Sequence, residues 1–268
     1  MPRRWTAQEE TEKRIELEEL YVRRNLPIGE IADLLGLAEM TVYNRLLRLG
    51  IRIQRELKPG YSHARHIPLP AYSGDLAEFC GIILGDGHIG AGQFWVTINA
   101  QTDLHYVPYV QDLCEELFAF RPRIARDRPG SVDLYLTSSS LVKSLSRIGL
   151  YSSNKVHDQV AVPRWIFDSL EYRRRFLRGL FDTDGSIYRL KHFNAVQMSF
   201  RNRSTPLLEG TRQALHDLGY HPSRVSSHSV YLTRRADIDR YIKEIGFGNA
   251  KHRFRAKAFR VMPASPRT

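Results

Sequence analysis

The sequence predicts an α+β protein in which a small all-helical N-terminal module precedes a larger, internally duplicated unit. The N-terminal stretch carries only helical periodicity, a Pro- and Gly-rich segment separates it from the remainder, and the remainder repeats one order of helices and strands. At 268 residues the chain is long enough for several modules. We expect a helical module over residues 1–56, a linker over 57–73, a first repeat over 74–164 and a second over 165–268.

The charge balance favours a polyanionic partner. The chain has 40 Lys and Arg against 29 Asp and Glu, a net charge of +11, and basic proteins gain affinity for nucleic acid by neutralising phosphates. Double-stranded DNA is the first expectation and an anionic membrane surface the second. No run approaches the ~18 apolar residues of a membrane span, and residues 1–10 lack the apolar stretch of a signal peptide. We expect a soluble protein of the cytoplasm, the nucleoid or an organelle matrix.

Helix signals are clear in the N-terminal module. Thr6 with Glu9 forms a capping box, which predicts a helix that ends before Pro27. A short helix over 28–35, a turn and a second helix over about 39–49 then resemble a helix-turn-helix DNA reader.

The second of these two helices has one apolar and one polar face. Val42, Leu46 and Leu49 form the stripe expected to be buried, while Ala32 and Gly36 allow close helix approach and a tight turn. The outward polar residues suit reading of base edges in the major groove. They are Thr41, Asn44, Arg45 and Arg48. A plain three-helix bundle with a charged solvated face remains the alternative.

The larger unit is an internal repeat. The apolar segment 77–89 recurs as 174–187, and each copy ends in Asp-Gly. A strand, a helix and a strand follow in both copies, over 94–100, 106–118 and 131–138 in the first and over 195–202, 205–218 and 224–233 in the second. Both copies close on a helix, an Ile-Gly pair and a Lys shortly after an Asn, Lys155 and Lys251.

Small residues in the two repeated helices predict a close helix pair. Gly81 with Gly85, and Gly179 with Thr183, stand four positions apart, so that the helix backbones can approach. The ends of both helices would then lie side by side.

Each of these ends carries an aspartate, Asp86 or Asp184. Two carboxylates at helix C-termini repel each other and oppose the helix dipole, and a divalent cation removes both problems. Carboxylate oxygens suit Mg²⁺, which can activate water in phosphodiester hydrolysis. Gly87 and Gly185 are expected to end the helices in a left-handed conformation.

These residues carry a family resemblance. The segments FCGIILGDG (79–87) and LRGLFDTDG (177–185) resemble the two signature motifs of the LAGLIDADG homing endonucleases, over about residues 72–262. The resemblance implies two pseudo-symmetric αββαββα halves, whose antiparallel sheets form a saddle over DNA. It implies a monomer that cuts both strands of a long asymmetric target across the minor groove, with Mg²⁺ on Asp86 and Asp184, where Ca²⁺ or Mn²⁺ could substitute.

The resemblance also implies further site residues. Lys155 and Lys251 match basic residues that polarise water or the scissile phosphate, and Gln101 and Asn202 match, more loosely, residues that position water. The first motif has Leu84 where the second has Asp182, a position that the family does not use as a metal ligand. DNA contacts are expected from Arg201, Arg203, Arg234 and Arg235, and the basic stretch 251–260 either faces phosphates or forms a solvated tail.

Two other functions share the expected scaffold. One is a transcriptional regulator without cleavage, against which the acids in both repeats argue, and the other is an RNA-splicing maturase. Cys80 and Cys114 have no ligand spacing and are expected in the core. The chain begins with Met and has no splicing-block residues in the usual places, so we expect a free-standing or intron-encoded protein rather than an intein.

Overall fold

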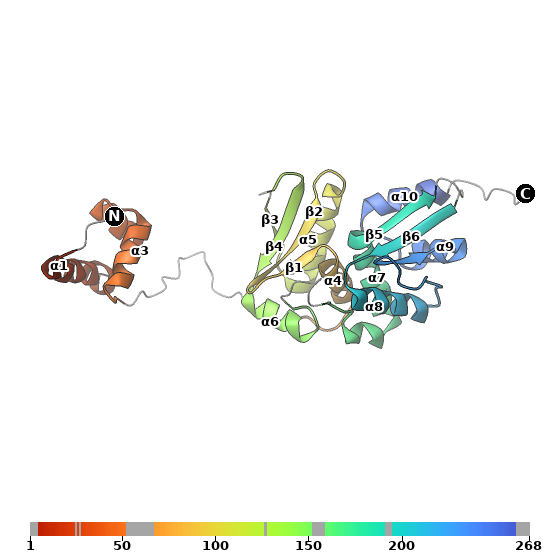
Figure 1. Cartoon of the computed structure of the whole chain (residues 1–268), viewed down its shortest axis with the longest axis horizontal. Helices are drawn as coiled ribbons and strands as arrows, with labels where there is room; N and C mark the ends of the chain where they lie inside the picture. The colour runs from red at the N-terminus through yellow and green to blue at the C-terminus, as the bar shows by residue number, and fades with distance from the viewer. Residues whose placement is uncertain are drawn as a thin grey trace, which may run out of the picture. The chain divides into compact units, whose positions relative to one another are not determined.

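The structure is a computed structural model that describes residues 5–24, 26, 28–51, 67–125, 128–151, 159–190 and 195–260. The chain divides into two compact units, Met1–His63 and Ala64–Thr268, which Figure 1 shows in colours that follow the chain. Within the described parts, no helix combines the length and the apolar character that a membrane span needs.

The N-terminal unit is all-helical, as expected. Its elements are α1 (Ala7–Leu17), a π-helical continuation η1 (Glu18–Arg23), α2 (Ile28–Leu35) and α3 (Glu39–Arg48). The capping box is confirmed, since the Thr6 hydroxyl accepts from the Glu9 N–H at 3.3 Å and the Glu9 carboxylate accepts from the Thr6 N–H at 2.8 Å. Gly36 makes the predicted turn with φ of +62°.

A small core holds these helices together. The predicted stripe of α3 is confirmed, because Val42, Leu46 and Leu49 are all buried, and they pack with Leu17 and Tyr21 from the first helix. Ile15, two positions before Leu17, lies on the opposite helix face and is 64% exposed.

The first half of the larger unit has the predicted order αββαββα. Its elements are α4 (Gly74–Leu84), β1 (Gly87–Ile89), β2 (Gln93–Asn99), the 3₁₀ turn η2 (Leu104–Tyr106), α5 (Val107–Phe118), β3 (Arg123–Ala125), β4 (Ser131–Thr137) and α6 (Ser139–Arg147). The four strands form an antiparallel sheet in the order β1-β2-β4-β3.

The second half repeats this order with one strand fewer. Its elements are η3 (Arg164–Asp168), α7 (Leu170–Asp184), β5 (Gly185–Leu190), β6 (Ala195–Arg201), α8 (Thr205–Asp217), β7 (Ser229–Leu232), α9 (Arg235–Glu244) and α10 (Ala250–Arg260). The sheet order is β5-β6-β7. The expected long strand over 224–233 is shortened because Ser227 and His228 have positive φ and form a turn. The α+β class is confirmed, and the fourth strand expected in this half is absent among the described residues.

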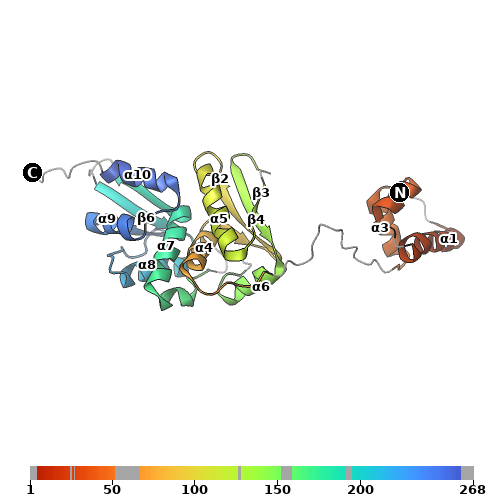
Figure 2. The ribbon, with the colours of Figure 1, turned by 180° about the vertical axis from the view of Figure 1, so that it is seen from behind.

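Helices α4 and α7 lie between the two sheets and pack closely (Figures 1 and 2). A Cβ atom added to Gly81 would lie 2.6 Å from the Leu180 nitrogen, and one added to Gly179 would lie 3.0 Å from the Glu78 carbonyl carbon. Real Cβ atoms do not approach so closely, so the close approach predicted from the small residues is confirmed.

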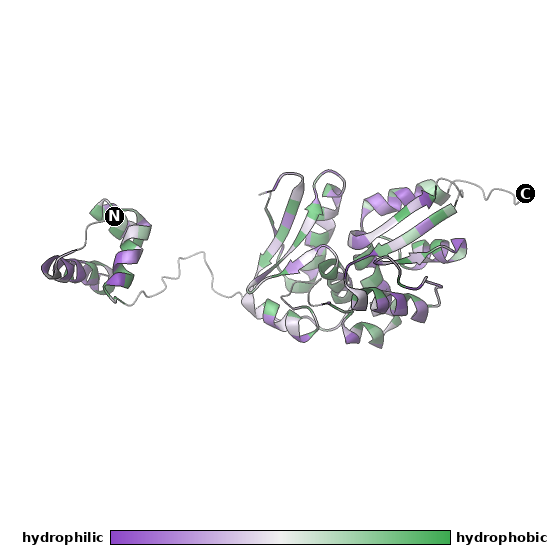
Figure 3. Ribbon diagram, in the orientation of Figure 1, coloured by the Kyte–Doolittle hydropathy of each residue, from purple (hydrophilic) through white to green (hydrophobic). Residues whose placement is uncertain are grey.

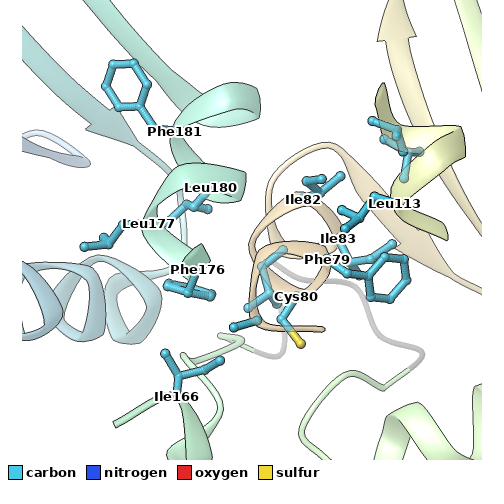
Figure 4. Close-up of a cluster of buried hydrophobic side chains, with 14 of the residues drawn as sticks. Phe79, Cys80, Ile82, Ile83, Leu113, Ile166, Phe176, Leu177, Leu180 and Phe181 are labelled. Carbon is cyan, nitrogen blue, oxygen red and sulfur yellow. The ribbon is translucent and has the colours of Figure 1, made fainter. Parts of the chain in front are cut away.

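Outward from this helix pair, each helix supports its own half. Figure 4 shows Phe79 and Ile83 of α4 on the side of Leu113 from α5, whereas Leu177 and Phe181 of α7 point away from α4. All five side chains are buried, and Figure 3 shows the apolar character of α4 as green. One continuous core therefore joins both halves.

Two segments differ from the sequence expectation. Residues 67–73, assigned to the linker, pack against the larger unit, since Ile67 is 1% exposed and Tyr72 stacks on Trp165 with ring centroids 4.5 Å apart. The basic stretch 251–260 lies within α10, whose His252 and Ala256 are buried. A solvated tail is therefore the wrong description of that stretch, because two of its side chains belong to the core.

Candidate active site

Helices α4 and α7 bring the two predicted acids to the same end of the helix pair. Helix α4 ends at Leu84 with Gly85 as its cap, so Asp86 follows directly, and Asp184 is the last residue of α7. A Cβ atom on Gly85 would lie 3.6 Å from the carboxyl carbon of Asp184. The carboxyl group of Asp184 therefore lies beside the residue that precedes Asp86.

Strand pairing shows which face these acids occupy. Gly87 pairs with buried Val96, and Gly185 pairs with buried Phe200. Side chains alternate along strands, so the aspartate before each glycine lies on the other side of its sheet from the core. Asp86 is exposed and Asp184 is partly exposed, which leaves both carboxyl groups accessible to a ligand that lies over the sheets.

The glycines after the acids have a different role from the predicted one. Gly185 is extended, with φ of −89° and ψ of 158°, and Gly87 lies in β1 outside the positive-φ glycines. Both are needed for space: a Cβ on Gly87 would lie 2.5 Å from the Ile83 Cα, and one on Gly185 would overlap Phe181. The predicted left-handed helix ends were wrong, because each chain enters a strand directly.

Asn202 contacts the second acid. Its side-chain amide donates to the Asp184 carboxylate at 2.6 Å, while its own oxygen accepts from the Ser204 N–H at 2.9 Å. Gln101, its predicted counterpart, lies on an exposed turn where its backbone N–H donates to the Asn99 side chain at 2.9 Å. The structure thus brings Asn202, but not the Gln101 side chain, into hydrogen-bond contact with an acid in its described parts.

Lys251 is held by a carboxylate from the other half. Its ammonium lies 2.7 and 2.9 Å from the two oxygens of Asp103. Burial raises the pKa of Asp103, but hydrogen bonds from Lys251, Thr102 and Asn249 outweigh it and hold that pKa below its ordinary value. The pair is therefore ionised at neutral pH. Lys155, the counterpart of Lys251, lies outside the described residues.

Asn249 extends this contact to α7. Its amide nitrogen donates to Asp103 at 2.8 Å and to the carbonyl oxygen of Asp182 at 3.3 Å. The Asp182 carboxylate accepts from the Gly248 N–H at 2.7 Å and from the Tyr106 hydroxyl at 3.4 Å. These five residues form a buried network across the halves, and we call it, together with Lys251, the cross-half network.

Asp182 is the deepest member of the cross-half network. It is 2% exposed, and burial raises its pKa to about 7 although backbone N–H groups at Asn249 and Gly248 oppose the shift. The sequence signal was an acid between apolar residues of a repeated helix. Its partners lie more than sixty positions away, and no local pattern could identify them.

A second buried acid links α4 and α7. Glu78 is fully buried and lies 3.0 Å from Arg175 and 3.5 Å from Arg178, and it accepts a hydrogen bond from the Tyr109 hydroxyl. Burial raises the pKa of Glu78, partly offset by the two arginines and Tyr109. This cluster stabilises the helix interface and was not predicted.

The acids fit a divalent cation that also binds phosphate. Within the described ranges, no three His, Cys, Asp or Glu side chains form a metal cluster, so Asp86 and Asp184 would supply two carboxylates, and water and DNA oxygens would supply the rest. Mg²⁺ is bound in this manner in nucleotide-processing sites. Cys80 and Cys114 are buried free thiols, and burial raises the pKa of both.

The predicted DNA-contacting arginines of the second half are all exposed. They are Arg201, Arg203, Arg234 and Arg235. Arg201 ends β6 directly before Asn202, whereas Arg235 pairs with Asp239 at 2.8 Å. Arg201 is therefore the one whose position in the chain connects it to the acid-bearing end of its sheet.

In the N-terminal unit, α3 presents Thr41 partly exposed and Asn44 exposed. Its two arginines have partners in the same unit: the guanidinium groups of Arg45 and Arg48 lie 5.3 and 4.6 Å from the centre of the Trp5 ring. Arg48 also lies 3.4 Å from Glu10. These arginines therefore lie over Trp5 instead of extending freely.

Comparison with known proteins identifies the second half. Residues 171–246 match the family of the LAGLIDADG-like domain. The chain contains a LAGLIDADG-like domain. The match begins within α7, includes Asp182 and Asp184, and ends after α9.

Curated relatives match over a limited part of their own length. The chain is 32% identical over 126 residues to a DNA gyrase, in its A-type polypeptide, from Mycobacterium gordonae, which covers 45% of this chain and 22% of the relative. It is 28% identical over 206 residues to the replication factor C small subunit from Thermococcus kodakarensis, which covers 72% of this chain and 22% of the relative. The chain thus spans about a fifth of the length of these relatives.

Solved structures were also compared with the LAGLIDADG-like chain. A mesophilic variant of the homing endonuclease I-DmoI has a TM-score of 0.45 at 18% identity and covers 65% of this chain and 95% of its own. Full-length WhiA from Thermatoga maritima has a TM-score of 0.46 at 15% identity and covers 74% of this chain and 65% of its own.

Proposed function

We propose that the protein is a site-specific endonuclease that hydrolyses both strands of double-stranded DNA with the help of a divalent metal ion. The observation that carries this proposal is that each half contributes one accessible aspartate, Asp86 or Asp184, to the same end of the α4–α7 pair. Two carboxylates concentrated at one point on a chain of net charge +11 are unfavourable for binding phosphates alone. With a cation they become useful for hydrolysis.

The residues have separate roles in this proposal. Asp86 and Asp184 would hold Mg²⁺, for which Ca²⁺ or Mn²⁺ could substitute, and the bound ion supplies charge stabilisation to a phosphodiester and lowers the pKa of water. Asn202 orients the Asp184 carboxylate through its 2.6 Å hydrogen bond. Lys251, kept charged by Asp103, and Lys155 would polarise the scissile phosphate or water.

DNA binding extends beyond the acids in this proposal. The outer faces of both sheets would receive the duplex, with Arg201, Arg203, Arg234 and Arg235 neutralising phosphates. The N-terminal module would act as a helix-turn-helix reader, supported by the positions of α2, the Gly36 turn and α3. We further propose that the chain works as a monomer, since both acids are present in one copy, with the module, linker and repeat limits given above.

The decisive experiment is cleavage of a randomised duplex library by the full chain, with Mg²⁺ and with EDTA. We expect cleavage of a small set of related sequences that requires the metal. On the selected target, Asp86→Asn and Asp184→Asn should each reduce cleavage by more than about a thousandfold on one strand, while Asp112→Asn, an exposed acid of α5, serves as the control.

Binding is measured on the same duplexes. Tight, sequence-specific binding by the wild type without cleavage in Mg²⁺ or Mn²⁺ would contradict the nuclease and favour a DNA-binding regulator. Cleavage that survives both substitutions would mean that the acids are not the metal ligands.

A further inference from the structure

The closing segment of each half crosses over and binds the other half. After α9, residues Gly248 and Asn249 contact the connection between β2 and α5 in the first half through Asp103 and Tyr106. After α6, Val160 accepts a hydrogen bond from the Ser204 hydroxyl, in the connection between β6 and α8, at 2.6 Å. The two crossovers occupy corresponding places in the fold.

Their chemistry differs. The first-half segment is held by a neutral hydroxyl on a carbonyl oxygen and by the Thr205 N–H on the Gln159 side chain at 3.0 Å. The second-half segment is held by a carboxylate, Asp103, that binds both the Lys251 ammonium and the Asn249 amide. Charge-assisted hydrogen bonds are shorter and stronger than neutral ones, so the second crossover is fixed more tightly.

The second crossover also reaches the acid-bearing helix. Asn249 and Gly248 donate to the carbonyl and the carboxylate of Asp182, in the last turn of α7. Gly248 fits without room to spare, because a Cβ there would lie 2.8 Å from the Asp182 carboxylate. That turn ends at Asp184, the proposed metal ligand. Force on the crossover is therefore transmitted to Asp184 through two residues of helix.

The first half does not have this acceptor. Aligning the two motifs places Leu84 where the second helix has Asp182, and Leu84 is 3% exposed with an apolar side chain that cannot accept a hydrogen bond. The network described for Asp184 therefore has no side-chain equivalent at the corresponding position beside Asp86.

We propose that Asp103 is a positioning residue for the Asp184 side of the active site. A residue of the first half thereby sets the geometry with which the second half's acid meets its phosphate, and the two DNA strands depend unequally on the cross-half network. This inference rests on the proposed endonuclease function.

The test measures the cleavage of each strand separately. The selected target carries different fluorophores on its two strands, and single-turnover rates are measured in Mg²⁺ with the full chain. Asp86→Asn and Asp184→Asn first assign each strand to its acid. Asp103→Asn is then expected to slow the Asp184-dependent strand at least tenfold and the other strand less than threefold. Asp103→Glu, which retains the charge, is expected to restore part of the rate.

Two further variants separate positioning from folding. Asn249→Ala removes the link between Asp103 and α7 and should reproduce the strand-selective loss. Asp237→Asn alters a buried acid of α9 that pairs with His221, so it controls for the loss of a buried carboxylate and should leave the ratio of the two rates unchanged. Thermal unfolding of every variant is recorded alongside.

The outcomes are distinct. Equal rates on both strands for Asp103→Asn and Asn249→Ala, whether both slowed or both unchanged, would overturn the positioning role while leaving the endonuclease intact. A wild type that binds its target but cuts neither strand would overturn the proposed function, and with it this inference.

Discussion

The two halves share their order of elements but carry their buried acids at opposite ends of the central helices. Aligned motifs place Glu78 of α4 opposite Phe176 of α7, and Leu84 opposite Asp182, and all four side chains are buried. Each acid finds its donors across the interface, so the exchange of an acid for an apolar residue is tolerated where the other half supplies partners. Pseudo-symmetry of the backbone thus does not require equal chemistry in the two halves.

The largest expected effect comes from removing the first-half acid. Glu78→Gln leaves Arg175 and Arg178 without their buried carboxylate, and breaking a buried pair in this way costs about 3–5 kcal/mol. Chemical denaturation at pH 7 should show this loss in the free energy of unfolding. Asp75→Asn removes an exposed partner of Arg175 and should cost less than about 1 kcal/mol. Similar losses for the two variants would refute a special role for the buried acid.

A symmetric effect is expected where the halves are alike. Gly81→Ala and Gly179→Ala both force the α4 and α7 backbones apart, and each should lower the free energy of unfolding by about 3 kcal/mol despite the better helix propensity of Ala. Gly92→Ala, whose Cβ would meet only the Ser139 hydroxyl at 3.1 Å, is the control. Unequal losses at the two helix positions would break the symmetry of this interface.

The pH dependence of stability should reflect a histidine of the second half only. Burial against Phe181 and Phe247 lowers the pKa of His252 to about 4, and the aligned first-half position is Val156. The folded state keeps His252 neutral while the unfolded chain binds a proton below about pH 6.5, so stability is retained above that pH and falls as pH decreases towards 4.

Between pH 6.5 and 5 this linkage amounts to about 2 kcal/mol. Denaturation at several pH values should show the decrease for the wild type and a smaller one for His252→Leu. The exposed His216→Gln should behave like the wild type. An unchanged slope in His252→Leu would show that other groups cause the acid sensitivity.

The smallest predicted effect compares the two amides near the acids. Asn202→Ala removes the hydrogen bond to Asp184 and should slow the strand assigned to that acid about tenfold, equivalent to about 1.4 kcal/mol. Gln101→Ala, on its exposed turn, should change either strand about twofold at most. A larger effect for Gln101 than for Asn202 would show that DNA reorganises the first-half site.

Much of the architecture could be predicted from local pattern. The capping box at Thr6, the bounds of α2 and the strands β2, β4 and β6 follow from periodicities of 3.6 and 2 residues, because local side-chain direction decides which face is buried. Shorter elements escaped prediction. Strands β1 and β3 have three residues each, too few to show alternation, and α10 has a basic sequence whose only buried positions are far apart.

The sequence by itself determined the duplication, the close helix pair and the meeting of Asp86 with Asp184, because glycine spacing and repeated motifs act through the nearest turns of one helix. Only the tertiary structure decided that Asp103 binds Lys251, that Asn249 reaches Asp182 and that Glu78 lies between two arginines. Those partners are separated by 67 to about 150 positions along the chain and come together through packing of the two halves. A polar group buried in that process must find whatever donor the other half offers.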